Sequence, residues 1–205
     1  MKADYRNSRS DFFDNLAPRW DEREHMDELK AKLAAAFLEF DVKEDEHICD
    51  IGCGTGNLTQ ALLEILGPSG HVAAIDISPV MIDIAREKIT DSRAQFLVET
   101  SDDMPFTDNS FHRVFCLSVW PHLENYSAHI QEFQRVLKPG GFVHVWHVVS
   151  RAKIDEIHSR ASGAVINDVL MPAEDTAGLF KDAGFEVVTV IDDSERYLVT
   201  AVKSV

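Results

Sequence analysis

The sequence has little cysteine and no long apolar run. Only three cysteines occur among 205 residues, and none of them forms a Cys-x-x-Cys pair. An odd number without a framework of paired spacings excludes a disulfide scaffold and favours free, buried thiols in a reducing compartment. No segment approaches the roughly 18 apolar residues that a membrane helix requires, and the N-terminus lacks an apolar signal stretch. We therefore expect a cytoplasmic protein with no membrane partner.

Positive charge is also scarce. Lysine and arginine together number 20 against 35 aspartate and glutamate residues, which gives a formal net charge of −15. A chain this acidic repels phosphate backbones, so no nucleic-acid partner that depends on a broad basic face is expected. The 45% hydrophobic and 27% charged residues are typical of a globular protein. The length, with no linker and no internal repeat, predicts a single domain over residues 1–205.

What the sequence does contain is an alternation of β-rich and amphipathic helical runs, which is typical of an α/β fold with a parallel sheet. Strands are predicted over residues 47–51, 72–77, 95–98, 113–119, 142–149, 185–191 and 197–202. Helices are predicted over residues 58–66, 79–89, 127–137, 154–161 and 173–183. Ser78 is the expected N-cap of the second helix. Pro139-Gly140-Gly141 is expected to end the third.

The residues before the first predicted strand have apolar side chains at helical spacing. These form two groups, first Phe12, Phe13, Leu16 and Trp20, then Met26, Leu29, Leu33, Phe37 and Phe40. A helical N-terminal cover is therefore predicted over residues 1–45. Met26, Leu29, Leu33 and Phe37 of the second group are expected to lie in the core.

The strongest local motif is Asp50-Ile51-Gly52-Cys53-Gly54-Thr55-Gly56-Asn57, between a predicted strand and a predicted helix. Glycines there permit unusual backbone angles and let a ligand approach the main chain, and the helix N-terminus adds N–H donors. Asp76 follows at the end of the next strand, 20 residues beyond Gly56. An acid at this place binds ribose hydroxyls in dinucleotide sites, which indicates an adenosine ligand.

The spacing of the motif decides between adenosine ligands. It is G-x-G-x-G, whereas nicotinamide-dependent oxidoreductases use G-x-G-x-x-G, which disfavours that class. No Gly-Lys-Ser/Thr is present, so a nucleoside-triphosphate loop is not expected. Asp50 would repel a pyrophosphate and attract a cationic amino group. S-adenosylmethionine fits these requirements because it has a ribose, an amino group and no phosphate. The alternative interpretation of the motif is a plain tight turn between strand and helix, without a ligand.

Four motifs follow one another along the chain. They are DIGCGTG (residues 50–56), AIDIS (residues 74–78) with Met81, MPFTDNSF (residues 104–111) and RVLKPGG (residues 135–141). With these motifs in this order, the sequence resembles class I S-adenosylmethionine-dependent methyltransferases. Within that class it is similar to the small single-domain group related to ubiquinone/menaquinone-type C-methyltransferases, with a methyltransferase type 11 domain. The resemblance covers residues 12–203. It implies a Rossmann-like, doubly wound, seven-stranded sheet, mostly parallel with the last strand antiparallel, and helices on both faces.

The resemblance also implies cofactor-binding positions after the first four strands. They are Asp50, Gly52, Cys53, Gly54, Gly56, Asn57, Asp76, Ile77, Ser78, Met81, Thr100, Ser101, Asp102, Leu117 and Ser118. The family usually has an acid or Asn for the adenine after the third strand, where this chain has Thr100 and Ser101. That contact is therefore expected from Asp102 or from backbone groups. His112 replaces an acid of the family, and Trp120-Pro121-His122 stands where His-His is frequent.

Methyl transfer is an in-line displacement, so a protein base is needed only if the acceptor carries a proton that must leave. Candidate groups belong at the carboxyl ends of the fourth and fifth strands. They are His122, His147 and His158, with packing as the alternative for each. His144 and His147 point to opposite faces of their strand, and one of them is expected to be packed with a backbone partner. The three candidates show no short metal-ligand spacing, so no metal is expected.

The aromatic residues of the N-terminal segment have two interpretations. Tyr5, Phe12, Phe13 and Trp20 would close over a sulfonium cation as a lid, because aromatic faces attract cations. Alternatively, Phe12, Phe13 and Trp20 pack the first helix onto the sheet.

The predicted function is methyl transfer from S-adenosylmethionine to a small-molecule acceptor. Residues 46–149 form the expected cofactor-binding half, and residues 150–205 the acceptor-side helices and closing strands. One alternative is a non-catalytic S-adenosylmethionine-binding or regulatory protein. Another is a metal-associated enzyme that uses the histidines near the fourth and fifth strands. The acceptor, its nucleophilic atom and the oligomeric state stay open.

Overall fold

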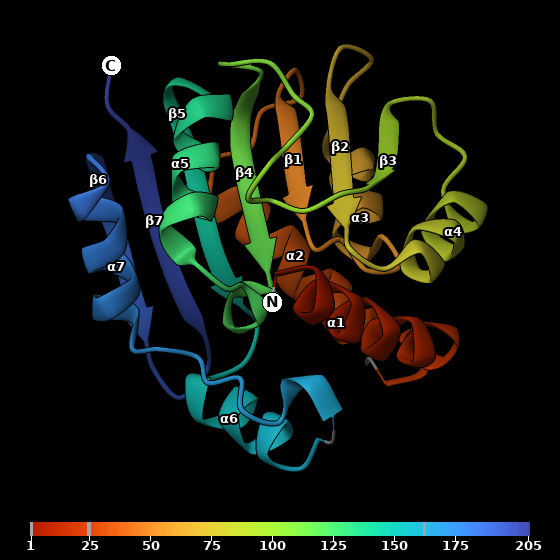
Figure 1. The fold of residues 1–205 in the computed structure, drawn as a ribbon. Coiled ribbons are helices and arrows are strands. Elements are labelled where there is room, and N and C mark those ends of the chain that lie inside the picture. Colours follow the sequence, from red (N-terminus) through yellow and green to blue (C-terminus); the bar gives the residue numbers. More distant parts are fainter. Residues whose placement is uncertain (1, 24–25, 162) are drawn as a thin grey trace. The chain divides into compact units, whose positions relative to one another are not determined.

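The computed structural model describes residues 2–23, 26–161 and 163–205 (Figure 1). Contacts divide the chain after Val98 into two units, Met1–Val98 and Glu99–Val205. This boundary falls inside the segment predicted as the cofactor-binding half. That residues 1–205 form a single domain therefore stays a prediction. Each of the two units contains strands and helices of its own.

Three parallel strands form the sheet of the first unit, in the order β3-β2-β1. They are β1 (His47–Ile51), β2 (His71–Asp76) and β3 (Ala94–Val98). Ile48, Ile51 and Ile75 are at most 2% exposed, as expected for parallel strands covered on both faces. Asp50 and Asp76 interrupt this apolar pattern, and both stand at or next to the carboxyl end of their strand.

Two helices connect these strands, α3 (Asn57–Ile65) and α4 (Pro79–Lys88). Ser78 caps α4 as predicted, because its Oγ accepts a hydrogen bond from the N–H of Met81 at 3.1 Å. Leu62 of α3 and Ile82 of α4 are fully buried against the sheet. The two helices therefore begin directly after the carboxyl ends of β1 and β2, where the candidate ligand residues stand.

The N-terminal cover is helical, as predicted. It consists of α1 (Lys2–Leu16), two short 3₁₀ helices η1 (Ala17–Arg19) and η2 (Asp21–Arg23), and α2 (Met26–Glu39). α1 packs against α4, and α2 packs against α3 (Figure 1). Leu29, Leu33 and Phe37 of α2 are buried, which confirms that they belong to the core, whereas Met26 is only half-buried.

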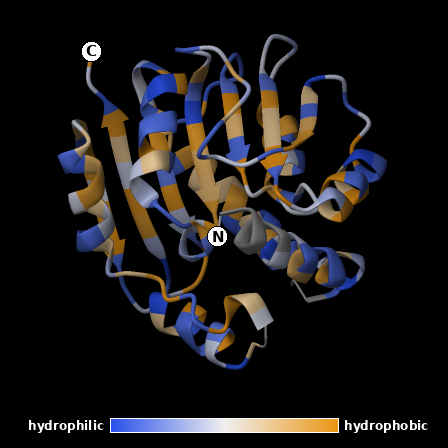
Figure 2. Ribbon diagram, viewed as in Figure 1, coloured by the Kyte–Doolittle hydropathy of each residue, from blue (hydrophilic) through white to orange (hydrophobic). Residues whose placement is uncertain are grey.

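Four strands form the sheet of the second unit, in the order β4-β5-β7-β6. They are β4 (Phe111–Leu117), β5 (Leu137–His147), β6 (Phe185–Asp192) and β7 (Tyr197–Lys203). β4 and β5 are parallel, and β7 runs antiparallel to β5 and β6. Hydrophobic residues dominate the strands in Figure 2. The predicted class, a seven-stranded and mostly parallel sheet whose last strand is antiparallel, is confirmed.

The helices of the second unit are η3 (Trp120–His122), α5 (Tyr126–Val136), α6 (Arg151–Ser159), η4 (Gly163–Val165) and α7 (Ala173–Asp182). α7 packs on β6 and β7, and α5 packs on β5 (Figure 1). Trp120 is fully buried, and its ring stacks on Phe180 with the centroids 5.8 Å apart. Within residues 2–23, 26–161 and 163–205, none of the helices has the length and the apolar composition of a membrane-spanning segment.

Several predicted boundaries are wrong. β4 begins at Phe111 and not at residue 113, and β5 ends at His147 and not at residue 149. α6 begins at Arg151 and not at residue 154.

Helix α5 ends at Val136 and β5 begins at the next residue, so Pro139-Gly140-Gly141 lies within the strand and does not end the helix. Pairing with β4 continues through this irregular stretch because the register shifts there. Strand β4 ends at Leu117 and not at residue 119, because Ser118 has a φ of 55° that ends the extended chain.

Candidate functional site

The glycine motif forms the turn between β1 and α3. Gly52, Gly54 and Gly56 have φ angles of 64°, 53° and 83°. Such left-handed angles cost free energy for any residue with a Cβ, so the unusual backbone angles predicted for this motif are confirmed. Gly56 has no room for a side chain either, since an added Cβ would lie 2.8 Å from Cδ1 of Ile89. The shape of the turn therefore depends on glycine.

Asp76, the last residue of β2, directs its carboxylate at this turn. Its Oδ2 accepts a hydrogen bond from the N–H of Gly54 at 2.9 Å, and its Oδ1 accepts one from the N–H of Ser78 at 2.9 Å. Burial raises the pKa of Asp76, and the main-chain donors oppose that rise. A carboxylate offers about four acceptor positions, so the carboxylate of Asp76 keeps acceptor capacity for a ligand hydroxyl beside its main-chain donors.

Asp50 lies beneath the turn, next to the end of β1, and is 1% exposed. Its Oδ2 accepts a hydrogen bond from Oγ1 of Thr59 at 2.6 Å. Burial raises the pKa of Asp50 to about 7; the Thr59 hydroxyl opposes this rise, and the charge of Asp76 adds to it. A nearby cation would favour the carboxylate, and a nearby phosphate would disfavour it. The two acids therefore suit a positively charged ligand.

Side chains of α1 bond to the segment after β2. Ser10 donates a hydrogen bond from Oγ to the carbonyl oxygen of Ile77 at 3.0 Å. The Asp14 carboxylate accepts hydrogen bonds from the hydroxyl of Ser78 and, at 3.3 Å, from the N–H of Val80. Two residues predicted to bind the cofactor, Ile77 and Ser78, are thus tied to the N-terminal cover.

Asp21 of η2 makes a second connection, to the glycine turn itself. Its Oδ1 accepts hydrogen bonds from Oγ1 of Thr55 at 2.6 Å and from Nδ2 of Asn57 at 3.0 Å. Its Oδ2 accepts one from Nζ of Lys88 at 3.0 Å, and Lys88 also donates to Oδ1 of Asn57 at 2.7 Å. Burial alone would raise the pKa of Asp21, but these hydrogen bonds hold it below its ordinary value.

The sequence predicted neither Asp21 nor Lys88 as part of this site. Thr55 lies 34 residues and Lys88 lies 67 residues from Asp21 in the sequence. No local spacing indicates a contact over such distances. The side chains of Thr55 and Asn57 are both engaged in hydrogen bonds with Asp21 and Lys88. Any contact that Asn57 makes with a cofactor would therefore come from its main chain.

Trp20, between the two 3₁₀ helices, lies beside the turn. Its Nε1 is 3.6 Å from the position of a Cβ added to Gly54. Its ring meets Phe13 edge-on with the centroids 6.3 Å apart, and Phe13 meets Phe12 in the same way at 5.3 Å. The half-buried Trp20 thus reaches the turn from the N-terminal cover. The side chain of Tyr5, also predicted for the lid, lies outside the described residues.

Cys53 and Met81 fill the interior beside the turn and are 8% and 1% exposed. Burial raises the pKa of the Cys53 thiol well above its ordinary value, so the group stays protonated. Cys49, Cys53 and Cys116 are all buried and in no disulfide, which confirms the prediction of buried thiols made from the cysteine count.

In the second unit, the loop after β3 holds the residues predicted near an adenine. Thr100 donates a hydrogen bond from Oγ1 to Oδ1 of Asp102 at 2.6 Å. Ser101 is 3% exposed, and its hydroxyl bonds to Nδ1 of His129 at 2.8 Å. The Ser101 side chain therefore faces the interior of its unit. The adenine contact stays a prediction for Asp102 or for backbone groups of this loop.

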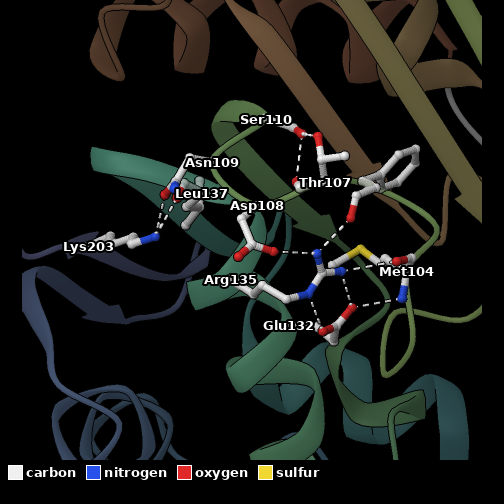
Figure 3. Close-up of polar contacts among 10 residues, drawn as sticks. Met104, Thr107, Asp108, Asn109, Ser110, Glu132, Arg135, Leu137 and Lys203 are labelled. Atoms are coloured by element: carbon white, nitrogen blue, oxygen red, sulfur yellow. Dashed lines mark hydrogen bonds and ion pairs between the residues drawn. The ribbon is translucent and has the colours of Figure 1, made fainter.

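Arg135 of α5 fixes the loop that carries the third motif (Figure 3). Its Nη1 and Nη2 donate hydrogen bonds to the carbonyl oxygens of Phe106 and Met104 at 2.6 and 3.0 Å. It also pairs with Glu132 at 2.7 Å and with Asp108 at 3.1 Å. Glu132 in turn accepts a hydrogen bond from the N–H of Met104 at 2.8 Å. Arg135 of the fourth motif thus orders the main chain of the third motif.

The ends of β4 and β5 lie side by side in this unit. The N–H of Ser118 donates a hydrogen bond to the carbonyl oxygen of Trp146 at 2.9 Å, and Leu117 pairs with Trp146 in the sheet. Leu117 and Ser118 are therefore at the carboxyl end of the sheet, where ligands of such folds bind. Their contact with a cofactor stays a prediction.

Two of the candidate histidines share one acidic residue. Nδ1 of His122 lies 2.6 Å from Oδ2 of Asp168, which is 46 residues away in the sequence. Nδ1 of His158 lies 2.8 Å from the carbonyl oxygen of Asp168, and this nitrogen must be the donor because a carbonyl only accepts. The two rings are 4.9 Å apart between centroids. The sequence places Asp168 in the acceptor-side segment, but nothing in its spacing predicts the pairing with His122.

His147, the last residue of β5, belongs to the same cluster. It is fully buried, and among the described residues neither ring nitrogen has a hydrogen-bond partner. Burial lowers the pKa of His147 to about 3, and the nearby His122 and His158 add to the effect. Its ring meets Tyr197 edge-on with the centroids 5.6 Å apart. The three candidate histidines thus lie near one another within this unit. Their catalytic role stays a prediction.

His144 is the packed histidine of β5, but the prediction of a backbone partner for it is wrong. Its Nε2 lies 3.0 Å from Nη1 of Arg113, and its Nδ1 lies 2.9 Å from Oγ1 of Thr200. Burial lowers the pKa of His144, and the charge of Arg113 lowers it further. Across the described ranges, no three or more His, Cys, Asp or Glu side chains are arranged to hold a metal ion.

Comparison with known proteins finds a family that is similar to the central part of this chain. Residues 48–141 match the family described as "Methyltransferase domain", and this segment contains the glycine turn, Asp76 and Arg135. This segment of the chain is similar to a methyltransferase domain. The resemblance of the sequence motifs to methyltransferases is thereby confirmed. His122 lies inside the matched segment of the methyltransferase domain, whereas His158 and Asp168 lie beyond it.

Curated relatives of this chain include two proteins named demethylmenaquinone methyltransferase. The one from Chlorobaculum tepidum is 34% identical over 149 residues, which are 68% of this chain and 59% of the relative. The one from Staphylococcus aureus is 31% identical over 135 residues, which are 64% of this chain and 56% of the relative. The chain thus spans less than two thirds of the length of these relatives.

Solved structures of similar fold also come from methyltransferases. A chain in the complex between the Haloferax volcanii Trm112 methyltransferase activator and a methyltransferase is 21% identical, with a TM-score of 0.77 over 94% of this chain and 98% of that chain. A SAM-dependent methyltransferase from Aquifex aeolicus is 23% identical, with a TM-score of 0.70 over 83% of this chain and 89% of that chain. At these identities the likeness shows the fold.

Proposed function

We propose that this protein transfers a methyl group from S-adenosylmethionine to a small-molecule acceptor. The observation that carries the proposal is the Asp76 carboxylate, which the N–H groups of Gly54 and Ser78 orient at the end of β2. A carboxylate held at this place matches the paired hydroxyls of a ribose without phosphate. The match of residues 48–141 to a methyltransferase domain supports the same conclusion.

The residues around the glycine turn fit such a cofactor. Gly54 has no side chain to block approach, and the buried Asp50 and Asp76 favour a cationic amino group over a pyrophosphate. S-adenosylmethionine, when bound, supplies a methyl group on a positively charged sulfur. Trp20, beside Gly54, offers an aromatic surface that attracts a cation.

A small molecule is the acceptor that the chain's charge favours. A net charge of −15 disfavours DNA and RNA as methyl acceptors. Two relatives are named for demethylmenaquinone, so a demethylmenaquinone-type naphthoquinol is the first acceptor to test. The proposal also places the protein in the cytoplasm, since free buried cysteines suit a reducing compartment.

The test is a turnover assay with the purified chain, S-adenosylmethionine and a panel of acceptors, in which S-adenosylhomocysteine is measured. Formation that saturates with both substrates supports the proposal. Binding of S-adenosylmethionine without turnover of any acceptor supports the non-catalytic alternative instead. Binding of NAD in place of S-adenosylmethionine would contradict the proposal altogether.

A further inference from the structure

We propose that Asp168 and His122 form a proton-accepting pair, and that the methyl acceptor is consequently a molecule whose nucleophilic atom carries an acidic proton, on a hydroxyl group or on a carbon acid. This inference rests on the proposed methyl transfer and adds to it the chemical class of the acceptor. It is carried by the arrangement of Asp168, His122, His158 and His147 within the second unit.

The geometry of the pair sets the state of the imidazole. Nδ1 of His122 lies 2.6 Å from Oδ2 of Asp168, and the two side chains are only 13% and 6% exposed. A carboxylate only accepts, so Nδ1 of His122 carries the hydrogen. In the neutral form of this ring, Nε2 carries the lone pair that a base needs. The little-exposed carboxylate stabilises the imidazolium that forms when Nε2 takes up a proton.

Asp168 is itself held in place from several sides. Its carbonyl oxygen accepts the hydrogen bond from His158, and its N–H donates to the carbonyl oxygen of Val165 at 3.0 Å. Two residues further along, the N–H of Leu170 donates to Oδ1 of Asp155 at 3.2 Å. The segment between α6 and α7 therefore presents the Asp168 carboxylate to His122 in a fixed position. His158 acts as a positioning residue for the pair.

His147 points independently to a polar ligand in this cluster. Its neutral ring has one N–H donor and one lone pair, and among the described residues neither finds a partner. An unpaired buried polar group costs about 1–3 kcal/mol, so proteins keep few of them. A hydroxyl group both donates and accepts, and it would satisfy such a ring. An acceptor with a hydroxyl group, or a carbon acid in its enol form, would supply both hydrogen bonds to His147.

The cluster also lies where ligands of this fold class bind. His147 is the last residue of β5, and His122 follows β4 by a few residues in η3. Ligands of open α/β sheets bind outside the carboxyl ends of the strands. The groups on the neighbouring elements are His158 and Asp155 on α6, Arg151 with its partner Asp192, and Tyr197 on β7. Burial raises the pKa of Tyr197, so its hydroxyl stays neutral beside His147.

The proton transfer balances in atoms and charge. Nε2 of His122 takes the proton from the O–H or C–H of the acceptor. The electron pair left on that atom forms the new bond to the methyl carbon. The bond from the methyl carbon to the positive sulfur breaks, and its electron pair stays on sulfur, which leaves neutral S-adenosylhomocysteine. The imidazolium, paired with Asp168, then releases the proton to water.

The experiment compares wild type with Asp168→Asn and His122→Gln. Turnover is followed across pH with substituted phenols and 1,3-dicarbonyls as protic acceptors, and with tertiary amines and thioethers as acceptors without a proton to lose. We expect kcat for protic acceptors to fall about 10²-fold or more near neutral pH in both variants. The loss should shrink as pH rises and the acceptor ionises by itself. The affinity for S-adenosylmethionine should not change.

Matched controls come from residues of the first unit outside the candidate site. Asp91→Asn removes a half-buried carboxylate that pairs with Arg93 at 2.6 Å, and His71→Gln removes an exposed histidine of β2. Both should keep the pH profile of wild type. In addition, nitrogen NMR of the imidazoles in unaltered protein should show the hydrogen of His122 on Nδ1, a result that needs no variant to fold.

The outcomes separate the two proposals. A wild-type chain that does not bind S-adenosylmethionine contradicts the proposed function. Binding with an unaltered pH profile in Asp168→Asn overturns the proton-accepting pair, as does a His122 hydrogen on Nε2. Binding with turnover of amines or thioethers alone, or with no turnover of any protic acceptor, overturns the acceptor class.

Discussion

The main-chain N–H of Gly54 and the Oδ2 of Asp76 lie 2.9 Å apart, although 22 residues separate them in the sequence. This hydrogen bond joins the turn after β1 to the end of β2. It gives the carboxylate of Asp76 one orientation before any ligand arrives, and it requires the left-handed turn that glycine provides. The first and second motifs of the sequence therefore act as one structure.

Replacing Asp50 with Asn should stabilise the chain at alkaline pH. The pKa of Asp50 is raised to about 7 in the folded protein, chiefly by burial. Since the folded value lies above the unfolded one, protonation favours folding, and this stability is lost as pH rises toward and through 7. At pH 8 we expect a gain on the order of 3 kcal/mol for Asp50→Asn, and almost none at pH 4. Urea unfolding at both pH values measures it; an equal gain at both would contradict the assignment.

The same Asp50→Asn substitution should weaken the binding of S-adenosylmethionine. A charge-assisted interaction contributes about 1.5–3 kcal/mol, so the dissociation constant should rise about tenfold or more. For wild type, affinity should fall as pH drops below about 7, because Asp50 becomes protonated. Calorimetry in buffers of different ionisation enthalpy would detect the proton released on binding. An affinity that does not vary between pH 6 and pH 8 would exclude this role.

Gly56→Ala should destabilise the protein by about 2 kcal/mol or more. The φ of Gly56 is 83°, and an added Cβ would lie 2.8 Å from Ile89 and 3.3 Å from Ala85. The matched control is Gly178→Ala, in helix α7, where an added Cβ meets nothing within 4 Å. Alanine there should be neutral or stabilising by about 0.5–1 kcal/mol. Thermal unfolding of both variants tests the contrast, and equal effects would argue against a strained turn.

Trp20 should report on cofactor binding. Trp120 and Trp146 are 0% and 3% exposed, whereas Trp20 is half-buried beside Gly54. S-adenosylmethionine should therefore change the emission of Trp20, and Trp20→Phe should remove that change. If the ring contacts the sulfonium, the dissociation constant should also rise severalfold, since cation–π contacts contribute about 0.5–2 kcal/mol. Trp146→Phe is the control that keeps the signal; a change of equal size in Trp20→Phe would refute the lid.

Arg135→Ala should disorder the loop over residues 104–111. The substitution removes the hydrogen bonds to the carbonyl oxygens of Met104 and Phe106 and leaves Glu132 without its cation (Figure 3). We expect a loss of about 1–3 kcal/mol in unfolding free energy and faster amide exchange in this loop. Arg160→Ala, whose side chain is 75% exposed, should have no measurable effect. Identical exchange rates in wild type and Arg135→Ala would contradict the role.

Much of the fold follows from the sequence because its signals are local. The glycine turn, the Ser78 cap and the apolar strands each depend on neighbours within a few residues. Pro139-Gly140-Gly141 was misassigned because tertiary pairing of β5 with β4 outweighs the turn preference of these residues. Tertiary contacts also explain which residues of the candidate site could not be predicted. Asp21 and Asp168 find their partners only in the folded chain, so no spacing in the sequence announces them.

The central claim is that Asp76 binds the ribose of S-adenosylmethionine, and calorimetric titration of the cofactor into wild type and Asp76→Ala tests it most directly. We expect saturable binding of one molecule per chain in wild type, and its loss in Asp76→Ala while circular dichroism shows both proteins folded. Unchanged affinity in Asp76→Ala, or no binding to the folded wild type, would contradict the account.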